Sequence, residues 1–231
     1  MDDATRLRRI GERAAAEVPD GAFVGLGTGS TADAMLAALA ARVRDGLRMT
    51  GVATSKGTAS RAGDLGIPLV SIDDVQRLDL CIDGADEIDP HLNLVKGRGG
   101  ALLYEKLVAE RADRFVVIAS AEKLVAQLGT RLPLPVEVVP FGHVHTMVSI
   151  RALNLIPTLR LGDDDSPFMT DGGHYIVDCQ SDGIADPDRL ANGLKALTGV
   201  IDHGLFVGMA TLALTVDAEG AISEHHAPER T

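Results

Sequence analysis

Cysteine, long apolar runs and clustered basic residues are all scarce in this chain of 231 residues. Cys81 and Cys179 are the two cysteines, too few for a disulfide framework, and both lie in apolar runs typical of small buried side chains. No apolar run approaches the roughly 20 residues that a membrane-spanning helix needs. The polar N-terminal stretch MDDATRLRRIGERAAAE is unlike a secretory signal. We therefore expect a cytoplasmic protein.

The charge is biased towards acid, with a net value of −11. This bias argues against a nucleic-acid surface, which needs clustered lysine and arginine. It also means that an anionic substrate gains no long-range attraction and must be held by local groups. Hydrophobic residues make up 45% and charged residues 24%, the ordinary balance of a soluble globular protein. We expect neither a nucleic-acid nor a membrane partner.

The first half of the chain alternates between short apolar runs and stretches of helical spacing. Strands are expected in residues 21–27, 47–54, 67–72, 77–83 and 114–120, and helices in 4–18, 30–46, 55–66 and 100–113. Strand, glycine turn, helix, strand is the pattern of a parallel sheet with helices packed on it. The strands are apolar throughout, as expected when both faces are covered.

The composition changes near residue 130, where three prolines surround a β-branched run. A helix is expected in 142–155, strands in 156–162 and 173–179, and a helix in 186–197 that begins near Asp186 or Asp188. This order predicts a small α+β domain over residues 130–203. The end, 204–223, again resembles buried strands.

The stretch GLGTGST, residues 25–31, follows an apolar strand and opens a helix. Glycines let the backbone approach a ligand closely, and the free N–H groups of a helix start suit a phosphate. The lysine of a GxxxxGK[ST] loop is absent, and the G-x-G-x-x-G spacing ends on Ala32. The alternative is a tight turn capped by Ser30. We favour anion binding by the N–H groups of the helix start, together with the hydroxyls of Ser30 and Thr31.

The stretch ATSKGT, residues 53–58, stands at the next strand–helix junction. By itself it indicates a helix N-cap, with Lys56 as an added point charge. It gains weight beside the first loop, because ligand sites of parallel sheets form at the carboxyl ends of strands. We therefore count Ser55, Lys56 and Thr58 as candidate ligands.

The stretch LVKGRGGALLYEK, residues 94–106, places Lys96 before a glycine-rich turn. A helix is expected to start near Gly100 or Ala101, with Glu105 about one turn into it. For an arbitrary helix, a charged pair such as Glu105 and Lys106 would indicate a solvated face.

The acidic stretch IDGADEID, residues 82–89, holds four carboxylates: Asp83, Asp86, Glu87 and Asp89. A capped turn, a calcium loop, a Mg²⁺ site and a polyol site are the alternatives. The D-x-[DN]-x-[DN]-G calcium pattern is absent, and Mg²⁺ is only weakly specified. Carboxylates can also accept hydrogen bonds from sugar hydroxyls without a metal. The histidines show no convincing ligand spacing.

These four motifs, taken in order, resemble the type A family of ribose-5-phosphate isomerases. LPLPVEVVPFG, TDGGHYIVDC and GVIDHGLFVGMA agree with it, so the resemblance covers nearly the whole chain. The pairing of DGADEID with KGRGGALLYEK is the most specific part. The family interconverts ribose 5-phosphate and ribulose 5-phosphate in the non-oxidative pentose phosphate pathway, without metal or cofactor.

The resemblance implies a Rossmann-like parallel sheet domain of residues 1–129 plus 204–231, a smaller α+β domain of 130–203, and a homodimer or homotetramer. It implies a catalytic Glu105, with Asp83, Asp86 and Lys96 around the sugar. Substrate binding is implied for Thr28, Gly29, Ser30, Thr31, Ser55, Lys56, Thr58, Gly97, Arg98, Gly99, Gly100 and Lys123.

The expected chemistry moves a proton between C1 and C2 through an enediolate, with Glu105 as the base and Lys96 facing the oxyanion. Asp83 and Asp86 would move hydroxyl protons. Two departures from the family pattern, Tyr104 in place of arginine and Glu122 beside Lys123, bear on substrate affinity more than on reaction type.

Three other functions fit parts of the same pattern. They are a sugar-phosphate-binding regulatory module, an amino-sugar phosphate deaminase and a CoA transferase. A regulator would carry a DNA-binding segment, and nothing basic precedes the sheet. A deaminase would want a histidine near the acidic loop, where His91 stands in a turn after Pro90.

Overall fold

The computed structural model describes residues 1–227, which form two compact units. The first unit comprises Met1–Ala85, Tyr104–Lys123 and the chain from Gly208 onward. The second comprises Asp86–Leu103 and Leu124–Val207. The predicted domain division stays a prediction; the compact units differ from it chiefly in residues 86–103. Residues 228–231 of the predicted first domain lie outside the described residues.

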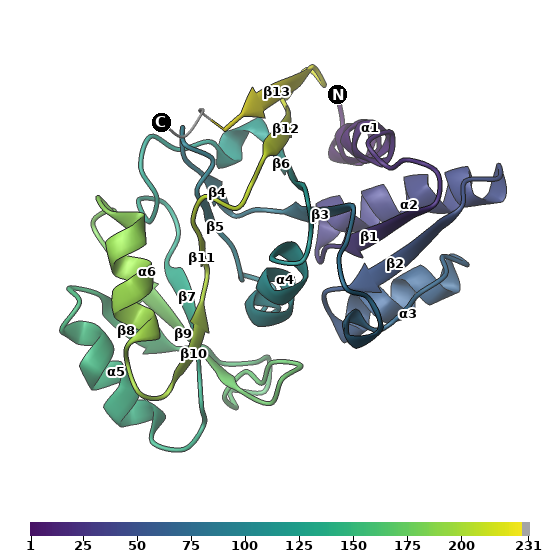
Figure 1. Ribbon diagram of the computed structural model, residues 1–231. Helices are drawn as coiled ribbons and strands as arrows, with labels where there is room; N and C mark the ends of the chain where they lie inside the picture. Colours follow the sequence, from purple (N-terminus) through teal and green to yellow (C-terminus); the bar gives the residue numbers. More distant parts are fainter. Residues whose placement is uncertain (228–231) are drawn as a thin grey trace. The chain divides into compact units, whose positions relative to one another are not determined.

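The first unit is built on a six-stranded sheet in the order β13-β12-β6-β3-β1-β2 (Figure 1). Its strands β1, β2, β3, β6 and β12 run parallel, and β13 is an antiparallel edge strand. The yellow C-terminal strands β12 and β13 thus join strands from the first half of the chain. The predicted parallel sheet is confirmed. The strands are β1 Ala22–Leu26, β2 Met49–Ala53, β3 Leu80–Gly84, β6 Phe115–Ser120, β12 Leu212–Val216 and β13 Ile222–His226.

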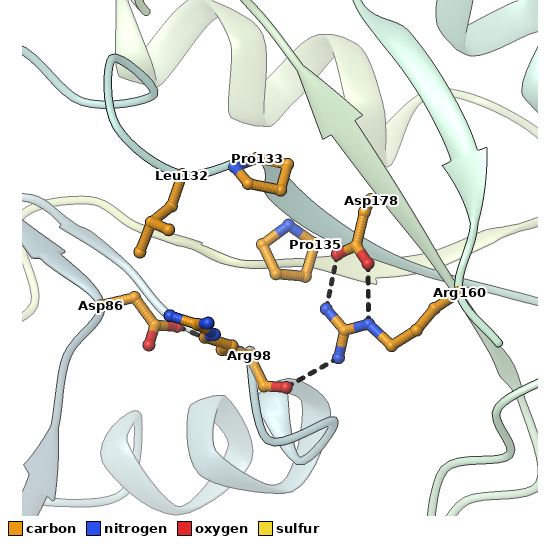
Figure 2. Close-up of a pocket in the computed structure, with 7 residues that line it drawn as sticks. All are labelled: Asp86, Arg98, Leu132, Pro133, Pro135, Arg160 and Asp178. Atoms are coloured by element: carbon orange, nitrogen blue, oxygen red, sulfur yellow. Dashed lines mark hydrogen bonds and ion pairs between the residues drawn. The ribbon is translucent and has the colours of Figure 1, made fainter. Parts of the chain in front are cut away.

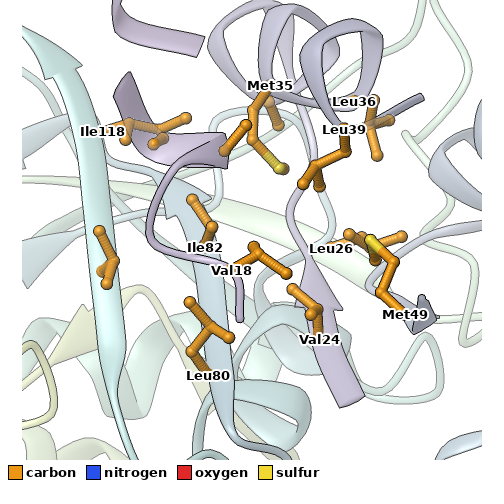
Figure 3. Packing of buried hydrophobic residues seen from close by; sticks show 14 of the residues in the cluster. Val18, Val24, Leu26, Met35, Leu36, Leu39, Met49, Leu80, Ile82 and Ile118 are labelled. Carbon is orange, nitrogen blue, oxygen red and sulfur yellow. The ribbon is translucent and has the colours of Figure 1, made fainter. Parts of the chain in front are cut away.

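Helices cover both faces of this sheet. On one face, alternate strand residues such as Leu26 and Ile82 pack in an apolar cluster with Met35 and Leu39 (Figure 3). On the other face, a methyl group at Gly25 would come within 2.6 Å of Val108 Cγ1, so α4 lies close against β1 there. Truncating one such core leucine to alanine costs about 2–5 kcal/mol. The helices are α1 Asp3–Ala15, α2 Ser30–Arg44, α3 Lys56–Asp64 and α4 Leu102–Ala109.

The strand predicted over residues 67–72 is wrong. Leu69 forms only an isolated bridge with Gly51, and a 3-10 turn, Ile72–Asp74, follows. Pro68 has no N–H to give to a ladder, and its carbonyl accepts from Gly51 instead. The segment therefore lies at the sheet edge without becoming a strand.

The second unit contains a four-stranded antiparallel sheet in the order β10-β7-β9-β8 and a three-stranded antiparallel sheet in the order β11-β5-β4. Asp186 caps α6, accepting from Arg189 N at 2.9 Å, as one of the two predicted start positions requires. The elements are β4 Glu87–Ile88, β5 Leu94–Val95, β7 Leu134–Val138, α5 His143–Arg151, β8 Ile156–Leu159, β9 Tyr175–Gln180, α6 Pro187–Lys195, β10 Val200–His203 and β11 Leu205–Phe206.

Two further expectations concern burial. Cys81 and Cys179 are both buried, as predicted, and neither forms a disulfide. Within residues 1–227, no helix combines the length and the apolar character that crossing a membrane requires.

Candidate active site

Four hydroxyl groups meet where β1 and β2 end in the first unit. Thr28 Oγ1 lies 2.8 Å from Thr54 Oγ1, 2.9 Å from Ser55 Oγ and 2.9 Å from Thr58 Oγ1. Thr54 and Thr58 donate onward to the carbonyls of Leu26 and Gly27. The cluster fixes the loop after β1 to the loop after β2. The structure thus brings together three of the predicted binding residues, Thr28, Ser55 and Thr58.

The start of α2 is the feature best suited to an anion. Its N-cap is Gly29, at φ 112°, a conformation that favours glycine and supplies no side-chain cap. The interpretation of Ser30 as the cap is therefore wrong, because Ser30 is the first helical residue. Gly29 and Ser30 are exposed and Thr31 is half-buried. The first N–H groups of a helix without a side-chain cap carry positive partial charge and can bind a phosphate.

The start of α3 differs, because it is capped. Ser55 Oγ accepts from Thr58 N at 3.0 Å, so the N-cap interpretation of this stretch is confirmed. Lys56 is exposed at the first helical position. Lys123 is half-buried at the end of a 3-10 turn, Ala121–Lys123, that follows β6. Its neighbour Glu122 accepts from Ser120 Oγ at 3.0 Å, which draws that carboxylate towards the end of β6.

Asp83 lies at the end of β3, beside the loop that follows β1. Its Oδ1 accepts from Thr28 N at 3.1 Å and from Gly84 N at 2.7 Å, and the side chain is fully buried. A methyl group at Gly27 would come within 2.2 Å of the same oxygen. The carboxyl ends of β1, β2 and β3 therefore hold one carboxylate and a hydroxyl cluster in a fixed arrangement.

Glu105 is the fourth residue of α4 and is 5% exposed. Its burial excludes the solvated helix face that such a residue would normally occupy. A carboxylate on a packed helix has few rotamers and little freedom to move.

The four carboxylates of residues 83–89 accept hydrogen bonds from different parts of the backbone. Glu87 accepts three backbone N–H groups, from Gly129 at 2.6 Å, Arg131 at 2.9 Å and Leu132 at 3.0 Å. Asp89 accepts from His91 N and Asn93 N, both at 2.8 Å, and so closes a turn. The capped-turn interpretation is confirmed for Asp89. Each carboxylate has its own backbone donors, which offsets the mutual repulsion.

Asp86 lies in the second unit and is bonded to the glycine-rich loop, residues 96–100. Its Oδ2 accepts from Arg98 N at 3.0 Å, and its own N–H donates to Val95 O. Arg98 and Gly99 are exposed, whereas Gly97 and Gly100 are buried at positive φ.

Lys96, at the start of this loop, is 2% exposed. Its N–H donates to Gly204 O at 2.8 Å, and its ammonium lies 5.4 Å from the centre of the buried Phe206 ring. An ammonium over an aromatic face keeps part of its stabilisation without water. The Lys96 side chain is therefore buried at the end of β5, against the ring of Phe206 on β11.

A cavity of about 300 Å³ lies in the second unit (Figure 2). Asp86 and Arg98 form one wall, and Arg160 and Asp178 form another. Three apolar residues complete the lining: Leu132, Pro133 and Pro135. Among the described residues, no group of three or more His, Cys, Asp or Glu side chains could hold a metal ion.

Comparison with known proteins places this chain. Residues 50–220 match the family model of ribose 5-phosphate isomerase A, also called phosphoriboisomerase A. The chain belongs to the ribose 5-phosphate isomerase A family. A ribose-5-phosphate isomerase A of Roseiflexus castenholzii is 52% identical over 96% of both chains.

Solved ribose-5-phosphate isomerase structures agree over the whole fold. A D-ribose-5-phosphate isomerase in complex with phospho-erythronic acid is 33% identical, with a TM-score of 0.94, and the match covers 98% of this chain and 100% of the other. Ribose 5-phosphate isomerase A of Methanocaldococcus jannaschii is 32% identical, with a TM-score of 0.93 over 97% and 100%. The predicted family and fold are confirmed.

Several residues that shape the candidate site could not be recognised in the sequence. Thr54 and Gly27 lie inside the motifs ATSKGT and GLGTGST, but their contacts with Thr28 and Asp83 become visible only in the folded structure. Phe206, beneath Lys96, is distant in sequence. Arg160 and Asp178 gave no sequence signal of a functional role, because a single charged residue in a strand of alternating apolar and polar residues usually faces solvent.

Proposed function

We infer that the chain is an aldose–ketose isomerase that interconverts ribose 5-phosphate and ribulose 5-phosphate. The observation that carries this inference is membership of the ribose 5-phosphate isomerase A family, with relatives about half identical over nearly the full length. A ligand named phospho-erythronic acid in a similar structure supports a phosphorylated sugar acid as an analogue of the substrate.

The phosphate is proposed to bind at the start of α2, against Gly29, Ser30 and Thr31, with Lys123 as a neighbouring cation. Support comes from the exposed helix start without a side-chain cap. Because the net charge is −11, local N–H donors and individual cations must supply the attraction. The Thr28, Ser55 and Thr58 hydroxyls bond one another, so we assign them to holding the loops, with Lys56 as a peripheral charge.

Glu105 is proposed as the base that takes a proton from one carbon of the sugar and returns it to the next. Its burial on α4 supports this role, because a fixed carboxylate can serve both carbons with little motion. General base catalysis of this kind contributes about 10²–10⁴ in rate.

Lys96 is proposed to stabilise the enediolate oxygen, a role that its desolvated position supports. Oxyanion donors of this kind contribute about 10²–10³ each. Asp83 and Asp86 are proposed to move hydroxyl protons, and each has one oxygen oriented by backbone N–H groups. The backbone of residues 97–100, Gly97, Arg98, Gly99 and Gly100, is proposed to contact the sugar.

The decisive test is incubation of the purified chain with ribose 5-phosphate, with ketose formation followed by its absorbance. Conversion to an equilibrium mixture is expected, and the reverse reaction should start from ribulose 5-phosphate. Release of ammonia from an amino-sugar phosphate, or acyl exchange with CoA, in the absence of isomerisation would contradict the proposal.

The reaction is proposed to need no metal or cofactor. Exhaustive EDTA treatment followed by gel filtration should leave kcat unchanged. Loss of activity that Mg²⁺ restores would return the acidic stretch to the metal interpretation.

We further propose that the enzyme is cytoplasmic and forms a homodimer or homotetramer, as the resemblance to the family implies. Sedimentation velocity at micromolar concentration measures the second point. A monomer at that concentration would contradict it.

A further inference from the structure

Arg160 joins two parts of the second unit that are distant in sequence. Its Nη1 donates to the carbonyls of Gly97 at 3.2 Å and Arg98 at 2.9 Å. Its Nε and Nη2 donate to the two oxygens of Asp178, at 2.8 Å and 2.5 Å. Figure 2 shows the guanidinium between Asp178 and the Arg98 carbonyl. A planar guanidinium held by both carboxylate oxygens has a fixed direction, so its remaining N–H groups are aimed at the loop.

The loop that it contacts needs such support. Gly97 and Gly100 have φ of 103° and 78°, and glycine backbones have the most freedom to lose on folding. Arg98 donates its N–H to Asp86, on the opposite side of the loop from the Arg160 contacts. The backbone of Arg98 is thus bonded through its carbonyl to Arg160 and through its N–H to Asp86.

Phe168 completes the support. A methyl group at Gly100 would come within 2.4 Å of Phe168 Cε1, so the ring lies close against the loop backbone. The Arg160 guanidinium carbon lies 5.7 Å from the centre of the same ring. Phe168 N also donates to Arg160 O at 2.9 Å. The Arg160 guanidinium and the Phe168 ring therefore both contact the 96–100 loop and each other.

We propose that Arg160, oriented by Asp178, is a positioning residue for catalysis: it fixes the 96–100 loop and thereby the placement of Asp86 and Lys96. This inference rests on the proposed function. Arg160 is not assigned any contact with the substrate. The Asp178 ion pair is 15% exposed at the arginine and 25% at the aspartate, enough shelter for the geometry to persist in salt.

The test compares kcat and KM of the wild type with those of the double variant Arg160→Leu/Asp178→Leu. Removing both charges leaves no unpaired carboxylate, so folding is preserved while the loop carbonyls lose their donor. We expect kcat to fall by about 10²-fold, the cost of a small misplacement of catalytic groups, and KM to change little because the phosphate contacts lie elsewhere. Arg160→Lys keeps the charge without the forked geometry and should not restore kcat.

Arg48→Leu/Asp20→Leu is the matched control. Arg48 forms the same kind of pair with Asp20 in the first unit, whereas the loop of residues 96–100 belongs to the second unit. Its kcat and KM should equal those of the wild type. Hydrogen–deuterium exchange should be faster in the peptide 96–101 of the Arg160 double variant and unchanged in the control.

A double variant with kcat within twofold of the wild type, or with unchanged exchange in residues 96–101, would overturn the proposal. An equal fall of kcat in the Arg48 control would also overturn it, since the effect would then follow from charge removal in general. A wild type inactive on ribose 5-phosphate would instead refute the proposed function. The exchange measurement needs no activity and separates the two failures.

Discussion

The Cα of Gly27 lies so close to Asp83 that a methyl group on it would come within 2.2 Å of Asp83 Oδ1 and 2.6 Å of Asp83 Cα. Since one of the clashing atoms is backbone, the strain cannot be relieved by a rotamer change. Any side chain at residue 27 must therefore displace the end of β3 from the loop after β1.

Gly27→Ala is expected to lower kcat by at least about 10²-fold, because the hydrogen bond from Thr28 N to Asp83 Oδ1 would be broken and the carboxylate displaced. Gly63→Ala is the control. Gly63 lies in α3 with nothing within 4 Å of the added methyl, so this change should leave kcat intact and raise stability by roughly 0.5–1 kcal/mol. Steady-state kinetics of both variants measure the difference, and a fully active Gly27→Ala would show that Asp83 can move without loss.

Glu105→Gln should lower kcat by about 10²–10⁴-fold or more with an unchanged circular dichroism spectrum, because the amide keeps the shape of the side chain and removes the proposed base. Glu110→Gln, at an exposed position just after α4, changes the same charge and should retain full activity. Near wild-type turnover of Glu105→Gln would remove the base assignment.

Lys123→Met should raise KM roughly tenfold and leave kcat within a factor of a few, because the hydrogen bond proposed between Lys123 and the phosphate would be equally present in the ground and transition states. Arg44→Met serves as the comparison, since Arg44 is exposed at the opposite end of α2. An effect on kcat alone would argue for a role of Lys123 in the chemical step.

Burial raises the pKa of the Cys179 thiol to about 12, with a further contribution from the charge of Asp178. Only roughly one thiol in 10⁴ is then a thiolate at pH 8, and the thiolate is the reactive form. Native protein treated with iodoacetamide at pH 8 should therefore leave Cys179 unmodified, whereas urea-unfolded protein should react. Rapid native labelling in the Cys179 peptide, measured by mass spectrometry, would contradict this.

Glu17 provides a pH-dependent contribution to stability. Hydrogen bonds from Arg114 and Arg13, at 2.7 Å and 2.6 Å, lower its pKa below the usual 4.5. The stabilisation is fully present above pH 4.5 and is lost as the pH falls through the lower folded value.

Glu17→Gln should therefore lower the free energy of unfolding by up to about 1 kcal/mol at pH 7, and the difference should vanish in strong acid. Urea titrations at both pH values measure it. Glu12→Gln is the control, because Glu12 is exposed and its nearest cation, Arg8, is 4.0 Å away. A Glu17 difference that persists in strong acid would mean that packing, not charge, is lost.

Much of this architecture could be predicted because the spacing of apolar residues and the residues that end helices and strands agree with the tertiary structure. The short apolar strands that enter glycine turns became β1, β2 and β3, and Asp186 began α6. The strand predicted over residues 67–72 failed because Pro68 breaks the ladder. The two-residue strands β4, β5 and β11 form by antiparallel pairing with one another, which gives no local periodic signal.

The candidate site also contains residues that could be predicted from the sequence and residues that could not. Motif residues such as Thr28 and Asp83 could be found because they lie at strand ends, where topology collects them. The burial of Glu105 could not be found, since a charged residue in mid-helix has the same local sequence whether it faces water or protein. Arg160 could not be found because the two loop carbonyls that it contacts, those of Gly97 and Arg98, lie 63 and 62 positions earlier in the chain.

The hydrogen bonds that the Glu87 carboxylate accepts from three backbone N–H groups affect how a mutational survey of this protein should be interpreted. Substitution of Asp86, through its proposed role, and substitution of Glu87, through these backbone contacts, should both lower the turnover measured in an activity assay, so that assay alone would not separate them. Loss of Glu87 should release the backbone of residues 129–132 and reduce the yield of soluble protein, whereas loss of Asp86, which is proposed to move hydroxyl protons, should leave the yield high and lower kcat. Expression level, recorded beside turnover, is what distinguishes scaffold from chemistry within one short peptide.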